Sequence, residues 1–348
     1  DNIVFHSSIL PTMMKAHGEY IMPDNVPANE FLNLEDDKIS TSRNWAVWAH
    51  EYLEDFPNQQ DTLRYVLTAN MPENKDNNFT WKDFQTKNNS ELVGILGNFI
   101  NRVMVLSHKY YEGIVPAKTI EFEELTEIKY FAKRIGDHLE KYEFRAALTE
   151  YMNLARLGNQ FLQAQEPWKK GDDPETVKGI MYTATQIAAA LGQLGEPFIP
   201  FASEKILAMM NVEKMTWDDL ESTDEFAKAG HQLGESELIF AKIEDEAIEA
   251  QINKLNESKV KNNMTNPNAE PQKELISFDD FQKMDIRIGT ILEAKKVEKA
   301  DKLFELKVDT GMDVRTIVSG IAEHFTLEEI VGKQAMVLAN LAPRKIRG

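Results

Sequence analysis

A short run of hydroxyl side chains lies between two cations in Lys38-Ile39-Ser40-Thr41-Ser42-Arg43. Acidic residues precede this run, and the apolar-periodic Trp45-Ala46-Val47-Trp48 follows it. The pattern predicts a polar loop that runs into a helix N-terminus, where hydroxyls can cap and free backbone N–H groups favour an anion. Lys38 and Arg43 suit a polyphosphate, whose negative charge grows during nucleotidyl transfer. An ordinary capped helix with solvated charges is the alternative from these residues alone.

A second polar group lies on the longest apolar pattern of the chain, which begins at Trp81 and ends before Gly113. Asn98 and Arg102 are four residues apart on one face of this expected helix, so both can reach one ligand. Together they offer donors and an acceptor of the kind that read nucleobase edges. Trp168 follows another expected helix, and its indole can stack on an unpaired base. The alternatives are an Asn at a helix contact, an Arg in solvent and a Trp that covers the core.

The apolar spacing is helical from residue 45 to about residue 210 and predicts an all-α bundle. The first helix is expected to carry Trp45, Trp48, Ala49 and Leu53 on one face and to end at Pro57. Further helices are expected over 62–69, 81–112, 121–142, 146–165, 174–194 and 201–210. Upstream, a helix is expected over 8–16, and downstream an amphipathic, acid-rich helix over 243–258.

The C-terminal part has a different period. Residues 259–274 are rich in Asn and contain two Pro, which is the composition of a linker. Alternation with period two then predicts four short strands over 285–291, 303–308, 315–319 and 335–340. With one helical piece over 326–331, this arrangement suits a small oligonucleotide-binding β-barrel.

Composition limits the class of protein. The chain has 348 residues, 42% of them hydrophobic, and contains no Cys and no run of about 18 apolar residues. Disulfides and cysteine zinc sites are therefore excluded within it, and a reducing cytoplasm is compatible. The net charge of −18 argues against a polyanionic partner. However, residues 275–348 hold 12 Lys+Arg and 12 Asp+Glu, so the acidic excess lies entirely in the first 274 residues.

The run from Lys38 to Arg43, called the signature loop below, resembles a loop of the methionyl-tRNA synthetase family. Lys38-Ile39-Ser40-Thr41-Ser42 is similar to the second signature of class I aminoacyl-tRNA synthetases, usually Lys-Met-Ser-Lys-Ser, and the match extends over 28–48. The resemblance implies that the loop binds ATP together with Mg²⁺. Its phosphates would contact Lys38, Ser40, Thr41, Ser42 and Arg43, and Lys38, Ser40 and Ser42 would have catalytic roles. Thr41 stands where the family has a second lysine, so Lys38 and Arg43 would carry the electrostatics.

Other segments resemble the same family in the same order. Residues 88–103 resemble its anticodon helix, and Gln165-Glu166-Pro167-Trp168 resembles the companion corner. This resemblance implies that Asn98, Arg102 and Trp168 contact the CAU anticodon. His6 matches a histidine of the methionine pocket.

Residues 278–348 resemble the tRNA-binding domain attached to many of these enzymes. Matching stretches include 285–289, 300–303, 315–321 and 339–345. The resemblance implies that Lys302, Asn340, Arg344 and Lys345 contact RNA, with surface lysines on a barrel as the alternative.

We therefore expect a multidomain chain. The end of an α/β Rossmann-type catalytic domain covers 1–58, and an all-α anticodon-binding domain covers 59–240. A linker with an amphipathic helix covers 241–274, and an incomplete OB-fold tRNA-binding β-barrel covers 275–348. The family's first signature, His-x-Gly-His, and its zinc-binding insertion are missing from the sequence. We expect a fragment of a longer polypeptide, with no metal site of its own.

The expected function is cytoplasmic methionine–tRNA ligation through methionyl adenylate, with ATP, methionine and tRNA(Met), including initiator tRNA, as partners. This chain would supply the tRNA-binding part, be inactive alone, contact no membrane and form a homodimer through its C-terminal domain. A non-catalytic tRNA-binding or scaffold protein is the alternative. The signature loop argues against that alternative, because a pure binding protein does not need it.

Overall fold

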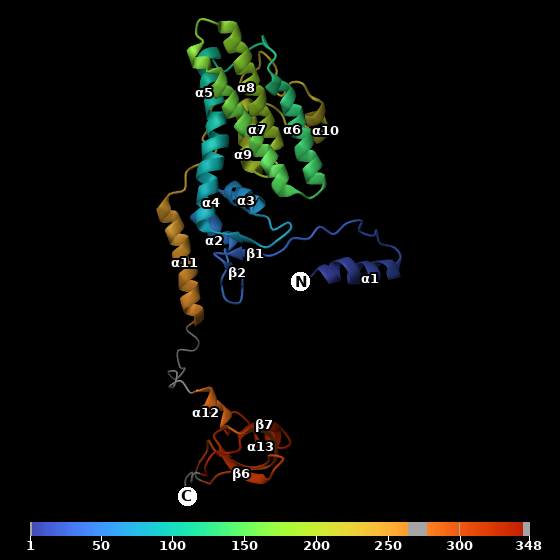
Figure 1. Cartoon of the computed structure of the whole chain (residues 1–348), viewed down its shortest axis with the longest axis vertical. Coiled ribbons are helices and arrows are strands. Elements are labelled where there is room, and N and C mark those ends of the chain that lie inside the picture. Colours follow the sequence, from blue (N-terminus) through green and yellow to red (C-terminus); the bar gives the residue numbers. More distant parts are fainter. Residues whose placement is uncertain (1, 264–276, 299, 344–348) are drawn as a thin grey trace. The chain divides into compact units, whose positions relative to one another are not determined.

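The computed structural model describes residues 2–263, 277–298 and 300–343 (Figure 1). Contacts divide the chain into two compact units, residues 1–267 and 268–348.

The first unit begins with a helical segment, as predicted. A π-helical stretch η1 (Phe5–Ile9) continues into α1 (Leu10–His17), which ends at Gly18 with a φ of 88°. Glycine is the usual residue at this left-handed end position. Most large apolar side chains of this segment and of the two residues before it are exposed: Ile3, Val4, Phe5, Ile9, Leu10 and Met13.

A small sheet follows, ordered β2-β1-β3. Strand β1 (Leu32–Leu34) pairs antiparallel with β2 (Asp37–Lys38) and parallel with β3 (Asn77–Phe79). The two residues between β1 and β2, Glu35 and Asp36, have φ values of 48° and 63°. Positive φ at both central positions is typical of a type I′ turn, which matches the twist of the paired strands.

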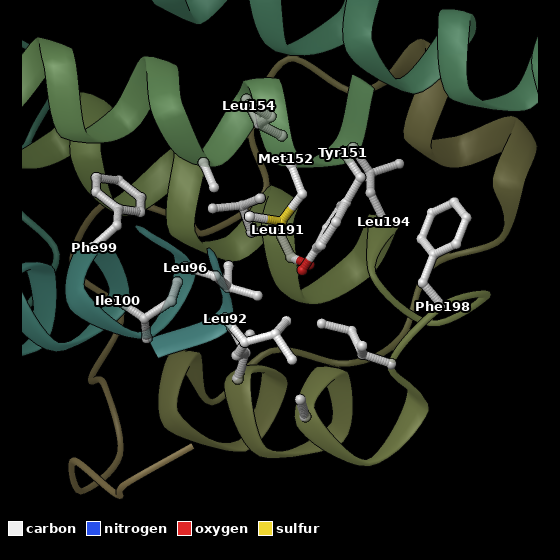
Figure 2. Packing of buried hydrophobic residues seen from close by; sticks show 14 of the residues in the cluster. Leu92, Leu96, Phe99, Ile100, Tyr151, Met152, Leu154, Leu191, Leu194 and Phe198 are labelled. Carbon is white, nitrogen blue, oxygen red and sulfur yellow. The ribbon is translucent and has the colours of Figure 1, made fainter. Parts of the chain in front are cut away.

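The prediction of an all-α bundle is confirmed. Its helices are α2 (Ala49–Asp55), α3 (Gln60–Ala69), α4 (Trp81–Lys87), η2 (Asn88–Gly97), α5 (Asn98–Tyr111), α6 (Glu123–Glu140), α7 (Phe144–Gln165), η3 (Pro167–Lys169), α8 (Pro174–Leu194), α9 (Pro200–Met210), α10 (Trp217–Ser222) and α11 (Asp245–Asn263). Every residue of α8 from Gly179 to Leu194 is buried. Figure 2 shows Leu191 and Leu194 of α8 beside Tyr151 and Met152 of α7 and Leu92 of η2.

The predicted long helix over 81–112 exists as three consecutive stretches. α4, the π-helical η2 and α5 follow one another without a break from Trp81 to Tyr111. At 1.5 Å per residue, Trp81 and Arg102 lie roughly 30 Å apart along this column. Its Trp81 end is fixed to the small sheet, because the backbone N–H of Trp81 donates to Glu35 Oε1 at 2.7 Å.

The prediction that a helix begins at Trp45 is wrong, because the first four residues of the predicted helix are not helical. Trp45 pairs with Ser40 in an isolated β-bridge, and α2 begins only at Ala49. The Trp45 indole is 6% exposed and donates through Nε1 to the carbonyl oxygen of Leu34 at 3.0 Å. This buried contact fixes Trp45 against β1 and overrides the local helical spacing.

The predicted amphipathic helix before the linker is α11, and it packs against α4. Ile248 and Leu255 of α11 are buried in the core of the first unit. Gln85 Nε2 donates to the Ile243 carbonyl oxygen at 3.1 Å and to Asp245 Oδ1 at 2.9 Å, which fixes the start of the helix. The linker predicted over 259–274 is wrong at its start, because α11 continues to Asn263; residues 264–274 lie outside the described residues.

The second unit is an antiparallel sheet, and its four predicted strands are present. They are β4 (Ile286–Lys296), β5 (Phe304–Asp309), β6 (Val314–Ser319) and β7 (Gln334–Leu338), ordered β6-β5-β4-β7, with short helices α12 (Phe278–Gln282) and α13 (Leu327–Ile330). A separate small core is made by Ile291, Phe304, Leu306, Val308 and Ile330.

Candidate functional site

The signature loop is a closed turn with a two-bond base. The backbone N–H groups of Ser40 and Trp45 each donate to the carbonyl oxygen of the other at 2.9 Å. Within the loop, Asn44 N–H donates to the Thr41 carbonyl oxygen at 3.0 Å, with Asn44 in the left-handed region at φ 49°. Asn44 Oδ1 also accepts from the Trp48 indole at 2.7 Å. The loop is therefore held at its base, while Thr41, Ser42 and Arg43 are exposed.

The side chains of the loop offer hydroxyls and cations. Ser40 Oγ and Ser42 Oγ are 3.3 Å apart, and Lys38 Nζ lies 5.2 Å from the centroid of the Phe31 ring. Across the described residues, no carboxylate forms an ion pair with Lys38 or Arg43. Two charged donors and paired hydroxyls can therefore bind phosphate oxygens. The expected helix N-terminus is not part of this site, because α2 begins four residues after Trp45.

A second site forms where α5 meets the corner after α7. The guanidinium carbon of Arg102 lies 5.3 Å from the centroid of the Trp168 ring. Trp168 belongs to η3, which the chain enters through Glu166 at φ 43° and the buried Pro167. The indole is 39% exposed, so it is held by Arg102 without being covered. A planar cation and an aromatic face in contact are suited to stacking with an unpaired base.

Asn98 lies one turn before Arg102 and is exposed. It lines a pocket of about 400 Å³ between the η2–α5 column and the segment from Ser236 to Phe240. Asn101 lines the same pocket. The structure therefore brings Arg102 and Trp168 together, and it places Asn98 one turn before Arg102, beside a pocket that neither Arg102 nor Trp168 lines.

A cationic pocket was missed by the sequence reasoning. The cations Lys87, Arg145 and Arg156 line a hollow of about 400 Å³ between α3, the α4–η2 column and α7, together with the carboxylates Glu73 and Glu91. Lys87 Nζ is paired with Asp83 at 2.6 Å, and Arg156 Nη1 donates to Asn153 Oδ1 at 3.0 Å. No ion pair of Arg145 or Arg156 is found in the part of the chain that the structure describes. The sequence offered only the helical spacing of Arg145 and Arg156 as a signal. Lys87, the third cation of the pocket, lies on a different helix.

His6 lies on η1 and is exposed. Its Nδ1 is 3.0 Å from the Asn2 carbonyl oxygen, and its ring contacts that of Phe5 edge-on at 5.5 Å between centroids.

In the second unit, two candidate residues have intramolecular partners. Lys302 Nζ lies 2.9 Å from Glu323 Oε1, and this hydrogen bond raises the pKa of Lys302. Asn340 accepts from the Asp285 backbone N–H at 2.9 Å and donates to the Lys283 carbonyl oxygen at 2.5 Å. Asn340 therefore fastens the end of β7 to the start of β4. Arg344 and Lys345 lie outside the described residues.

Among the described residues, no helix is both long and apolar enough to cross a membrane.

Three families match successive parts of the chain. Residues 1–104 match class I tRNA synthetases (M), residues 117–259 match the anticodon-binding domain of methionyl tRNA ligase, and residues 286–348 match a putative tRNA-binding domain. The chain is 62% identical over 354 residues to a methionine–tRNA ligase of Flavobacterium psychrophilum, covering 100% of this chain and 52% of that protein. It is 56% identical over 353 residues to the enzyme of Bacteroides fragilis, again covering 100% of this chain and 52% of the relative.

Solved structures share the fold. A methionyl-tRNA synthetase of Mycobacterium tuberculosis in complex with methionyl-adenylate superposes with a TM-score of 0.62 at 21% identity, covering 69% of this chain and 48% of that one. The free form of that enzyme gives 0.60 at 19% identity, with coverages of 70% and 48%. The chain spans about half the length of the curated relatives it matches. On its sequence, matched from first residue to last, the chain belongs to the methionyl-tRNA synthetase family.

Proposed function

We propose that this chain supplies the phosphate-binding loop and the tRNA-reading surfaces of a methionine–tRNA ligase (EC 6.1.1.10). The observation that carries the proposal is the contact between Arg102 and the partly exposed Trp168, one helical turn from Asn98. A free aromatic face beside a guanidinium and an amide is the chemistry that recognises unpaired bases. In this proposal Asn98, Arg102 and Trp168 read the CAU anticodon of tRNA(Met), initiator tRNA included.

The signature loop binds the phosphates of ATP. Lys38 and Arg43 supply charge, Ser40, Thr41 and Ser42 supply hydroxyl donors, and Lys38, Ser40 and Ser42 act during the reaction. A methionine carboxylate oxygen attacks the α-phosphorus, a new P–O bond forms, and the bond to pyrophosphate breaks. The loop neutralises the charge that develops on the departing phosphates. It contains no carboxylate, so Mg²⁺ would be held chiefly by the phosphates themselves.

The methionine pocket would include His6. The adenylate then passes methionine to the terminal adenosine of the tRNA. The enzyme chiefly positions the reactants in both steps, because no covalent enzyme intermediate is needed. The 348 residues contain no His-x-Gly-His motif, so by themselves they would bind tRNA without charging it.

The RNA backbone is contacted at two further places. Arg145 and Arg156 of α7 line the pocket between α3, the α4–η2 column and α7. In the second unit, Lys302, Arg344 and Lys345 contact RNA, while Asn340 acts through the sheet that it fastens. Phosphate contacts of this kind add affinity without reading sequence.

The second unit also offers a dimerisation surface. Ile286 pairs with Leu338 and Ile288 with Met336 across β4 and β7, and all four side chains are exposed on one face of the sheet. A row of exposed apolar side chains on a sheet favours pairing with another copy. We therefore propose that the chain forms a homodimer through residues 275–348.

The other proposed domains are the end of the catalytic domain over 1–58, the anticodon-binding domain over 59–240 and the linker over 241–274. We propose that the protein is cytoplasmic.

The test is binding of the 348-residue chain to tRNA with a CAU anticodon and to the same tRNA with a changed anticodon, at fixed salt. Preference for CAU that is lost in Arg102→Ala supports the proposal. Equal binding of both tRNAs would favour the alternative, a non-catalytic tRNA-binding or scaffold protein that engages RNA only through its second unit.

A further inference from the structure

The end of helix α11 contacts both borders of the signature loop. Lys259 Nζ lies 2.5 Å from Oδ2 of Asp37, the residue immediately before Lys38. Ser258 Oγ accepts a hydrogen bond at 3.2 Å from Nδ2 of Asn44, the residue immediately after Arg43. Two neighbouring residues of one helix therefore bridge the two sides of the loop, which starts and ends at these positions.

The same lysine also supports the base of the loop. Lys259 Nζ lies 4.2 Å from the centroid of the Trp45 ring, and Trp45 forms the backbone bridge to Ser40. An exposed ion pair alone contributes little to stability, and the side chains of Lys259 and Asp37 are 51% and 53% exposed. Here the ammonium is shared between the carboxylate and an indole that is 6% exposed, so part of it is shielded from water.

Helix α11 is itself anchored a turn earlier. Lys254 Nζ lies 2.5 Å from Asp55 Oδ2, and Gln251 Nε2 donates to the same oxygen at 2.8 Å. Leu255 is buried in the core between these anchors and the loop. The end of α11 is therefore held in a fixed position beside the loop, because two polar contacts and a buried side chain fix the preceding turns of the helix.

We propose that the last described turns of α11 position the signature loop, with Lys259 as the positioning residue. The contacts fall on Asp37, Asn44 and Trp45, which border the loop. Lys38, Ser40, Ser42 and Arg43 keep their polar groups for a phosphate. This inference rests on the proposed function, in which those residues bind the phosphates of ATP. Lys259 touches no phosphate and acts by limiting how far the loop base opens.

The first test needs no catalysis. Hydrogen–deuterium exchange is measured on the whole 348-residue chain for peptides that cover 37–45. Lys259→Ala is expected to speed exchange of the Ser40 and Trp45 amides about five-fold, because the bridge between them opens more often. Lys254→Ala is the matched control: it removes a lysine of the same helix that contacts Asp55 and not the loop. Gln251 and the buried Leu255 still hold α11 in this variant, so exchange at 37–45 should rise much less than in Lys259→Ala.

Two results would overturn the inference. One is unchanged exchange of the loop amides in Lys259→Ala. The other is an equal increase in Lys254→Ala, which would mean that the docking of α11 as a whole, and not Lys259, holds the loop. Exchanging the two charges, Lys259→Asp with Asp37→Lys, should restore part of the protection.

A second measurement separates this inference from the proposed function. In a chain that includes the complete catalytic domain, Lys259→Ala should lower kcat for ATP–pyrophosphate exchange several-fold, with KM for methionine unchanged. Faster amide exchange with unchanged kcat would keep the contact between α11 and the loop but overturn the loop's proposed role with ATP. Unchanged amide exchange would overturn the positioning role whatever the loop binds.

Discussion

The guanidinium of Arg102 lies 5.3 Å from the ring centroid of Trp168, so α5 and the corner after α7 meet at these two side chains. The arginine supports one part of the indole, and 39% of the residue stays accessible. If Trp168 stacks on a base as proposed, this contact would reduce the conformational freedom that the indole loses on binding.

The stacking role of Trp168 can be tested directly. Trp168→Ala should weaken binding of a CAU anticodon stem-loop by about 1–3 kcal/mol, the usual contribution of one stacked base. Trp168→Phe is the control, since it keeps an aromatic face and should retain most of the affinity. Fluorescence titration measures both variants. An affinity of Trp168→Ala equal to that of the unchanged chain would rule out the anticodon assignment.

The arginines of the cationic pocket should affect salt dependence more than sequence preference. Arg145→Ala and Arg156→Ala should each reduce the slope of log K against log salt concentration by about 1, because one phosphate contact is lost. The preference for CAU over a changed anticodon should persist. Lys133→Ala is the control, because Lys133 lies on α6 and is paired with Asp137 at 2.9 Å. Slopes that match that control would remove the pocket from the RNA-binding surface.

Asn340 should contribute to the stability of the second unit. Asn340→Ala removes the hydrogen bonds to the Asp285 N–H and the Lys283 carbonyl, and should lower the unfolding free energy of the unit by about 1–2 kcal/mol. Amide exchange over β4 and β7 in the whole chain measures this change. Leu341→Ala, at a neighbouring residue that is 72% exposed, should have little effect. Weaker RNA binding with unchanged stability would instead make Asn340 a direct RNA contact.

The docking of α11 should depend on pH through Asp55. Hydrogen bonds from Lys254 and then Gln251 lower the pKa of Asp55. A carboxyl whose folded-state pKa is below its unfolded value of about 3.9 stabilises the fold above that pH, and the contribution is lost as pH falls through the folded pKa. Asp55→Asn should therefore be less stable than the unchanged chain at pH 7, and the difference should shrink near pH 3.

Urea unfolding at the two pH values measures that difference for the first unit. Glu235→Gln, at an exposed residue, is the control, and its stability relative to the unchanged chain should be the same at both pH values. A stability difference for Asp55→Asn that stays constant from pH 7 to pH 3 would mean that the carboxylate charge does not hold α11 in place.

Local periodicity in the sequence determined the long helices and the four strands of the second unit, but it did not predict the small sheet of β1, β2 and β3. The apolar spacing along 81–111 predicted the α4–η2–α5 column, and it placed Asn98 and Arg102 on one face because a helix repeats every 3.6 residues. Alternation with period two predicted β4 to β7, because successive side chains of a strand point to opposite faces of the sheet. These features depend on residues close together in the chain, so the sequence alone was sufficient. The site roles carried by family resemblance remain predictions.

Only the tertiary structure decided which distant residues meet. Trp45 continued a helical pattern in sequence, but its indole hydrogen bond to Leu34 holds it outside α2. The contact of Arg102 with Trp168 and the contact of Lys259 with Asp37 each join separate elements. No local period encodes such contacts, because they arise when the buried faces of several helices pack into one core and fix the exposed faces relative to each other.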